Sequence, residues 1–308
     1  MLKYTGRRLV QFIPVLIGAT IICWALVWAL PGDPFRGRCG QVACSPQYIQ
    51  AMTEKYGLDK PLPVQYLVFL KNVFTGNLGQ TFSGLEISDV IGRALPVTVR
   101  LALISVAIQV VLSAVVGIWS GLRANGAFDV TALFTSLILF SLPIFVVAFI
   151  AQYVLGVRLE LVKPTVSTAA PTRELILPAA VLAIGTLATL MRILRASVAE
   201  GMHADYLRTA RAKGFTESRV VGVHLMRNVM APALNVLGLE FAALLGGTVI
   251  VEGIFNIKGV GGLIYRAIQD REQLTVSTVV TLVIVFYLVI NLVVDVACAQ
   301  LDPRSRND

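Results

Sequence analysis

Residues 101–122 read LALISVAIQVVLSAVVGIWSGL, which is 22 consecutive residues without a charged side chain. A helix of about 20 such residues spans the roughly 30 Å hydrocarbon core of a bilayer. Five further stretches have the same character: Leu9–Leu30, Val130–Leu155, Leu175–Met191, Pro232–Val251 and Gln273–Val294. Together the six hold one charged residue, Glu240. Because backbone polar groups in lipid must be paired within their own segment, the pattern predicts an all-α membrane protein with six transmembrane helices.

The overall composition excludes soluble classes of protein. Only 14% of the 308 residues are charged and 56% are apolar, whereas a soluble chain has about 25% charged residues. This excludes a soluble globular domain, a disordered chain and a cytosolic enzyme. The first stretch follows Lys3, Arg7 and Arg8 as a signal peptide would. Its apolar run is longer than the usual 7–15 or so residues and no small-residue cleavage site follows, so we expect a retained signal-anchor helix.

The basic residues between the stretches predict the orientation. With the N-terminus inside, the inner connections and ends hold thirteen Lys and Arg, and the two short outer connections hold six. Positive residues concentrate on the cytoplasmic side, so both termini are expected there, in a multi-pass protein of the cell membrane surrounded by lipid. The net charge of +8 is then explained by the basic residues expected on the cytoplasmic side of the membrane. No basic patch interleaved with aromatic residues indicates nucleic-acid binding.

We expect four parts along the chain, as follows. They are a cytoplasmic N-terminus with the first span (1–30), an extracytoplasmic loop with short amphipathic helices (31–96), a five-span core with a cytoplasmic loop at 195–231 (97–298), and a cytoplasmic tail (299–308).

The outer loop carries two local predictions. Ser45-Pro46 predicts the start of a helix that runs to Gly57, and a second helix is predicted from Pro63 to Gly76. Cys39 and Cys44 lie on the side where disulfides persist, so the sequence allows a disulfide between them but does not require one. No metal site is expected, because neither histidine lies on that side.

The inner connection predicts two short helices that meet at Gly214. Asp205 can cap the first, and Gly214 supplies a left-handed end. Thr216 is the expected N-cap of the second helix, with Glu217 in its first turn. Such a projection suits docking into a groove of a partner. The alternative is a solvated basic turn that only satisfies the positive-inside rule.

This segment resembles the cytoplasmic loop of binding-protein-dependent ABC importer permeases, and more narrowly that of the first permease subunit of the dipeptide/oligopeptide/nickel group. Arg208-Thr209-Ala210 stands at the family's Glu-Ala-Ala place, and His224–Arg227 replaces its Ile-x-Leu-Pro. Further segments similar to this group are Leu30–Pro34, Gly57–Leu62, Gly76–Gly79, Leu95–Thr98, Val251–Asn256 with Gly259–Leu263, and Leu301–Arg304.

The resemblance implies type I ABC importer permease architecture and uptake of di- or oligopeptides by ATP-driven alternating access, with nickel or another small solute as the alternative. The implied partners are a second related permease subunit in a heterodimer, two ABC ATPase subunits and an extracytoplasmic substrate-binding protein. The chain has no G-x-x-x-x-G-K-[ST] phosphate loop, so ATP would be hydrolysed by partners; we expect no enzyme activity and no cofactor. The implied ATPase-coupling residues are Asp205, Arg208, Thr209, Ala210, Lys213, Gly214, His224, Arg227 and Asn228.

Several residues outside this loop are weaker candidates. An acid within a span is functional or paired, so Glu240, with Asn235 nearby, either lines the translocation pathway or makes a structural pair. Asp295 is expected to pair with Arg192 or Arg195. The candidates for contact with a binding protein at the outer mouth, beside an expected re-entrant turn, are Glu252, Phe255, Asn256, Gly259 and Gly261. Ser141–Pro143 predicts a kink in the third span.

Two other classes of function compete with this one. An intramembrane enzyme needs an acidic or His/Cys cluster at the membrane face, and a secondary transporter commonly shows internal repeats. The sequence shows neither.

Overall fold

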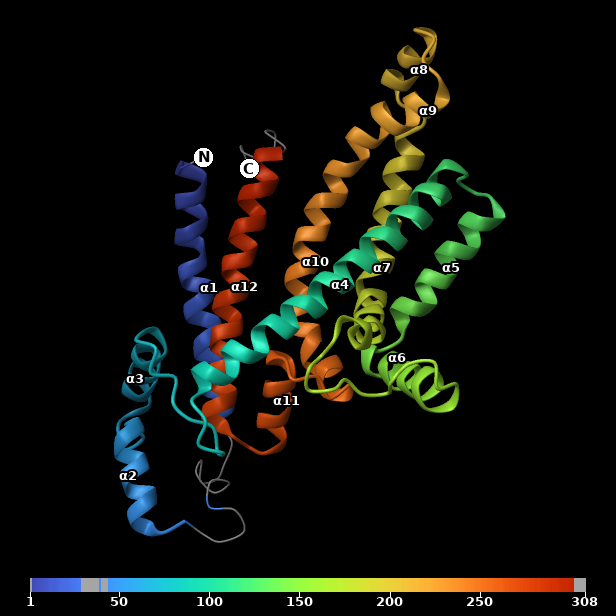
Figure 1. The fold of residues 1–308 in the computed structure, drawn as a ribbon. Coiled ribbons are helices and arrows are strands. Elements are labelled where there is room, and N and C mark those ends of the chain that lie inside the picture. The colour runs from blue at the N-terminus through green and yellow to red at the C-terminus, as the bar shows by residue number, and fades with distance from the viewer. Residues whose placement is uncertain (1, 29–38, 40–43, 302–308) are drawn as a thin grey trace. The chain divides into compact units, whose positions relative to one another are not determined.

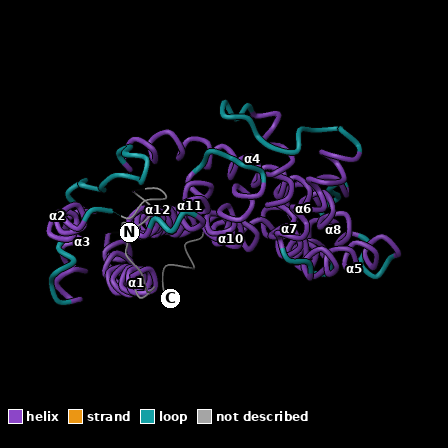
Figure 2. The backbone as a smooth tube through the Cα atoms, turned by 90° about the horizontal axis from the view of Figure 1, so that it is seen from below, coloured by secondary structure: helices purple, strands orange, loops and turns teal. Residues whose placement is uncertain are grey.

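Helices joined by loops make up nearly all of this chain, as a computed structural model shows (Figures 1 and 2). The structure describes residues 2–28, 39 and 44–301; only the backbone is described at 2–5, 7–9, 28, most of 231–247 and 294–301. In these ranges there is no strand, only an isolated bridge between Gln80 and Glu86. The protein is therefore all-α, as predicted.

Four helices are long and apolar enough to cross a membrane by themselves. They are α1 (Leu2–Trp28), α4 (Ile87–Leu122), α7 (Thr172–Gly201) and α12 (Gln273–Leu301). The predicted fifth span lies in α10 (Met226–Ile254), which is helical throughout although most of its central side chains are outside the described set. Over the residues that the structure describes, every predicted span except the third is one continuous helix.

The predicted third span is broken rather than merely kinked. It consists of α5 (Ala127–Ser141), followed after Pro143 by α6 (Ile144–Ala151) and the π-helical segment η2 (Gln152–Arg158), with a bend of 99°. Leu142 is extended, at φ −83° and ψ 129°, a conformation that the ring of the following proline favours over the helical one. The position of the break was predictable, but its size was not.

Two predicted boundaries shift because helices continue past the apolar stretches. Helix α4 starts at Ile87, inside the expected outer loop, and carries Asp89 in its first turn, where a carboxylate is favoured by the helix dipole. Helix α7 ends at Gly201 and α10 begins at Met226, so the non-spanning part of 195–231 is shorter than expected.

The chain divides into two compact units, and the first comprises residues 1–98 and 258–292. Its outer helices are α2 (Pro46–Tyr56) and α3 (Leu62–Phe74), both predicted; Ser45 caps α2 and Gly57 ends it at φ +66°. Trp24, Phe69 and Val73 form a small core in this unit. Nearby, the hydroxyls of Thr20 and Tyr66 are 2.8 Å apart. Helix α1 is thus held against α3 by side-chain packing and a hydrogen bond. Helix α11 (Val260–Gln269) also belongs to this unit.

The second unit comprises residues 99–257 and 293–308. Besides most of α4 and all of α5, α6, α7 and α10, it contains α8 (Asp205–Ala212), α9 (Glu217–Arg219) and the π-helical segment η3 (Val220–Leu225). Its core joins α7, α8, η3 and α10 through Leu194, Val198, Leu207, Leu225 and Val229. This core supports the segment with the strongest functional prediction.

Candidate functional site: the 205–228 loop

The 205–228 loop forms the tip of the second unit, where α7 ends and α10 begins (Figure 1). Helix α8 ends at Ala212, and Gly214 reverses the chain at φ +79°. Thr216 then occupies the N-cap position of α9, as predicted, although its side chain makes no capping hydrogen bond. The two short helices that the sequence predicted are therefore present, with the left-handed glycine between them.

One detail of the prediction was wrong. Asp205 is the first residue of α8, and Ala204 holds the N-cap position at φ −72° and ψ 144°. The Asp205 carboxylate still lies in the first turn, where negative charge suits the helix dipole. Asp205 is 98% exposed in its side chain, so that carboxylate is available to a partner.

The loop is fixed from below by apolar packing. Leu207 and Leu225 are fully buried, and Ala210 is 5% exposed; they pack with Leu194 and Val198 of α7. Burying a leucine side chain is worth about 1.5–3 kcal/mol relative to exposure. The loop is consequently a rigid extension of α7 and not a free turn.

An ion pair crosses the turn at the loop's surface. Arg211 donates from Nε to Glu217 Oε1 over 2.7 Å. This hydrogen bond from Arg211 lowers the pKa of Glu217 below its usual value. The pair keeps α8 and α9 at a set separation on either side of Gly214.

A ring stack occupies the inner side of the same turn. The rings of Phe215 and His224 are stacked with centroids 5.4 Å apart, and the Arg219 guanidinium lies 4.7 Å from the Phe215 centroid. The carbonyl of His224 accepts a hydrogen bond from the Asn228 side chain over 3.1 Å. These contacts give His224 a structural place in the loop.

The predicted coupling residues separate into a surface set and a packed set. Ala210 is buried and His224 is half-buried. The exposed members are Asp205, Arg208, Thr209, Lys213, Gly214, Arg227 and Asn228. The exposed set offers charged and polar groups of both signs to a partner.

The other predicted residues lie in α10 and in the segment that follows it. Asn235 and Glu240 lie in α10, and their side chains are outside the described set. Glu252 and Phe255 are buried, at 0% and 1% exposure, whereas Asn256 is exposed. Of these last three residues, only Asn256 presents a surface to a partner.

The expected turn at 257–263 extends only as far as Gly259, because α11 begins at Val260. Gly259 is the extended N-cap of α11, and Gly261 is buried inside that helix. The backbone N–H of Val260 donates to Thr98 Oγ1 over 2.8 Å, which satisfies one of the free donors of the helix start. Consecutive glycines suggest a turn, but here Gly261 and Gly262 are buried residues of a helix.

Sequence reasoning missed a buried ion pair. Asp129, 1% exposed, accepts hydrogen bonds from Arg195 Nε over 3.0 Å and from Arg195 Nη2. Arg195 thus has Asp129 as its described partner, and the expected pairing of Asp295 with Arg192 or Arg195 falls on a side chain outside the described set. Asp129 stands one residue before an uncharged stretch, so counting charges within the spans overlooked it.

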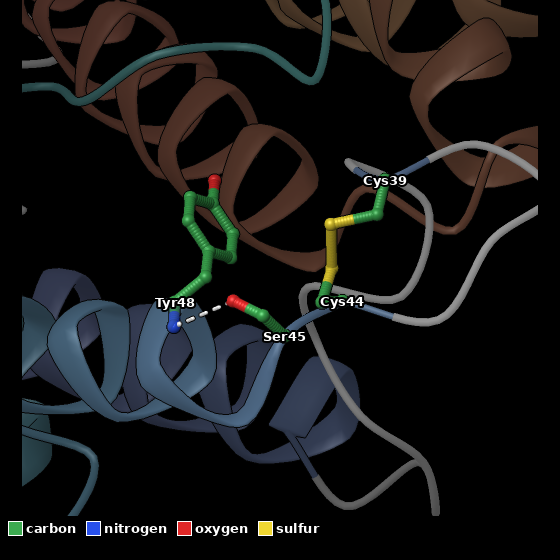
Figure 3. Close-up of a disulfide and its surroundings, with 4 residues drawn as sticks. All are labelled: Cys39, Cys44, Ser45 and Tyr48. Atoms are coloured by element: carbon green, nitrogen blue, oxygen red, sulfur yellow. Dashed lines mark hydrogen bonds between the residues drawn. A yellow bond between two sulfur atoms is a disulfide. The ribbon is translucent and has the colours of Figure 1, made fainter.

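Cys39 and Cys44 form a disulfide. Cys39 and Cys44 are joined directly before α2, and the next residue, Ser45, accepts a hydrogen bond from the Tyr48 backbone N–H (Figure 3). The bridge and the cap together fix the start of α2.

A helical membrane protein with several spans and a rigid two-helix projection is typical of a transport subunit that works with a partner. The chain belongs to the family described as binding-protein-dependent transport system inner membrane components, which it matches over residues 113–307, and to that family's N-terminal part over residues 1–102. It is thus a multi-pass permease of the ABC importer type, a family that works with ATPase and substrate-binding partners.

Relatives match over nearly their whole length. The dipeptide transport system permease protein DppB of Alkalihalophilus pseudofirmus is 32% identical, covering 99% of this chain and all of the relative. The oligopeptide transport system permease protein AppB of Bacillus subtilis is 34% identical, with 99% of each covered. The glutathione transport system permease protein GsiC of Pectobacterium atrosepticum is 34% identical over 99% of each.

Proposed function

We propose that this chain is the membrane-spanning subunit of an ABC importer that takes up di- or oligopeptides. The observation that carries the proposal is the set of relatives named for dipeptide, oligopeptide and glutathione transport, each aligned over at least 99% of this chain. Glutathione is itself a tripeptide, so the three names share one chemical class of substrate.

The 205–228 loop is the proposed site of coupling to the partner ATPases. Its exposed residues include Arg208 and Thr209 of α8, a helix whose other face is packed on α7, and Lys213, which directly follows that helix. A displacement of α8 is therefore transmitted to α7, whereas a flexible turn would absorb it. The sequence has no phosphate loop of its own, which agrees with ATP being used by partners.

The orientation follows from this assignment. Both termini and the 205–228 loop are cytoplasmic, on the side that holds thirteen Lys and Arg. The Cys39–Cys44 disulfide supports an extracytoplasmic place for the segment before α2, because disulfides persist in oxidising compartments. A second, related permease subunit completes the pathway in a heterodimer, and Asn256 is the exposed candidate for contact with a substrate-binding protein.

Glu240 and Asn235 are the proposed polar groups of the pathway. A carboxylate about 12 Å along a spanning helix is costly unless it is paired or meets a polar solute. The ammonium group of a peptide supplies such a partner. Glu240→Gln is then expected to reduce uptake of a free dipeptide more than uptake of the same dipeptide with its amine acetylated.

Uptake by the reconstituted complex tests the function. The chain is co-expressed with its partner permease and ATPases, placed in proteoliposomes with ATP inside, and supplied outside with its binding protein and radiolabelled Ala-Ala. We expect accumulation that needs both ATP and the binding protein. Accumulation of radioactive nickel instead, with no dipeptide uptake, would contradict the peptide assignment.

A further inference from the structure

We propose that Asp129 and Arg195 are positioning residues that lock α4, α5 and α7 into one transmitting body behind the 205–228 loop. The inference rests on the proposed coupling function of that loop. It concerns how movement at α8 reaches the spans.

Three segments meet at the Asp129 carboxylate. It lies in the first turn of α5 and accepts from Ser120 Oγ of α4, and from the Asn125 backbone N–H in the α4–α5 turn over 2.8 Å. The third partner is Arg195 of α7, which reaches both carboxylate oxygens. A two-point guanidinium–carboxylate contact fixes orientation as well as distance. One side chain thus sets the mutual placement of three helical segments.

Helices α4 and α7 are also in close contact over the turns that lead to this point in each helix. Ser113 Oγ donates to the Leu187 carbonyl over 3.2 Å. A Cβ on Gly117 would lie 2.7 Å from the Met191 carbonyl oxygen, and one on Gly121 would lie 2.7 Å from that of Arg195. The three small residues of α4 and the three carbonyls of α7 both repeat every four residues, so α4 follows α7 in register for two helical turns. Small residues at such spacing allow close approach of helices in membranes.

The Arg195 end of α7 leads directly to the loop. Helix α7 continues from Arg195 to Gly201, and α8 begins at Asp205. Val198, one turn after Arg195, is fully buried in the core that also holds Leu207 of α8. The side chain next to Gly121 of α4 is this same Val198, with 2.7 Å from its Cβ to a Cβ built on the glycine. Displacement of α8 therefore has a packed route to α7, and from there to α4 and α5.

The Asp129–Arg195 pair fixes the placement of the helices more than it stabilises the fold. Burial of two charges costs solvation energy that their attraction often fails to exceed, whereas removal of one partner leaves a buried charge and is strongly destabilising. Replacing both partners by neutral groups removes the link without leaving a charge. The double substitution separates a role in transmission from a role in folding.

The test uses the complete complex and the stimulation of its ATP hydrolysis by its substrate-binding protein, which requires a signal to cross the permease. In the double variant Asp129→Asn/Arg195→Gln we expect normal assembly and basal hydrolysis, but stimulation lowered by roughly two- to thirtyfold, the range found for mutations in coupling networks. Arg195→Lys keeps the charge but loses the two-point contact, and should also lower stimulation. The control is Glu174→Gln, which breaks the Lys163–Glu174 pair at the other end of α7 and should leave stimulation unchanged.

Wild-type stimulation in both the double variant and Arg195→Lys would overturn the inference. Stimulation that returns in the double variant in parallel with protein yield, after loss in Asp129→Asn, would assign the pair to folding and also overturn it. The proposed peptide substrate fails separately: the wild-type complex would then be stimulated by its binding protein and yet take up no Ala-Ala.

Discussion

Arg211 and Glu217 form an ion pair across the turn at Gly214, with Nε and Oε1 2.7 Å apart. Both side chains are solvent-exposed, so the pair sets the angle between α8 and α9 more than it stabilises the fold. The rigid parts of the loop are the apolar core below and the left-handed glycine in the turn.

Gly214→Ala should weaken coupling. At φ +79° a Cβ costs roughly 1 kcal/mol even though no atom lies within 4 Å of its position, so the turn is expected to change conformation. The measurement is dipeptide uptake per ATP hydrolysed in proteoliposomes, which should fall at wild-type expression. Gly222→Ala is the matched control, because Gly222 has an ordinary φ and equally open surroundings in the same loop. Equal effects of the two alanines would argue against a special role of the turn.

Glu217→Gln should have a small effect that salt removes. The lowered pKa of Glu217 means that its contribution is fully present above the unfolded pKa of about 4.3 and is lost as the pH falls through the lower folded value. Between about pH 6 and 8 the difference in melting temperature from wild type should thus be constant. High salt should abolish it by screening. A difference that grows from pH 6 to pH 8 would contradict this explanation.

Gly121→Ala should destabilise the packing of α4 on α7. The added Cβ would be 2.7 Å from both the Arg195 carbonyl oxygen and Val198 Cβ. Overpacking of this kind costs about 1–3 kcal/mol. Thermal unfolding in detergent should show a lower melting temperature than for Gly92→Ala, a control on the same helix with open surroundings. The prediction fails if the two variants melt together.

The two outer cysteines should resist alkylation until the protein is reduced. Mass spectrometry of digested protein from membranes should show Cys39 and Cys44 linked, and Cys23 as a free, half-buried thiol. Replacing both outer cysteines by alanine removes a short-loop crosslink worth about 2 kcal/mol in the chain-entropy model. We expect faster proteolysis near α2, while a double variant that is cut at the wild-type rate would show that the Ser45 cap suffices.

Local signals in the sequence were sufficient for the short helices. Pro46 after Ser45 and the left-handed glycines at 57 and 214 fix helix ends by steric rules that act within a few residues. The apolar stretches likewise identify spans, because the bilayer imposes a length. These features depend on local chemistry, so a single sequence contains them.

The pairings between distant residues could not be predicted in the same way. Asp129 and Arg195 are separated by 66 positions, and nothing local indicates that they meet. Burial was also hidden: Glu252 and Phe255 looked like surface candidates but are enclosed by the fold. Gly117 and Gly121 are four residues apart in an apolar helix, which is a signal for close helix contact that could have been used.

The 99° bend between α5 and α6 bears on which side of the membrane each terminus lies. If the bent pair crosses the bilayer, it and the helices α1, α4, α7, α10 and α12 cross an even number of times, and the termini lie on the same side. If the pair enters and leaves by one face, the number of crossings is odd and the termini lie on opposite sides. A topology reporter fused to each terminus therefore determines whether a break at Pro143 still lets the chain cross the membrane.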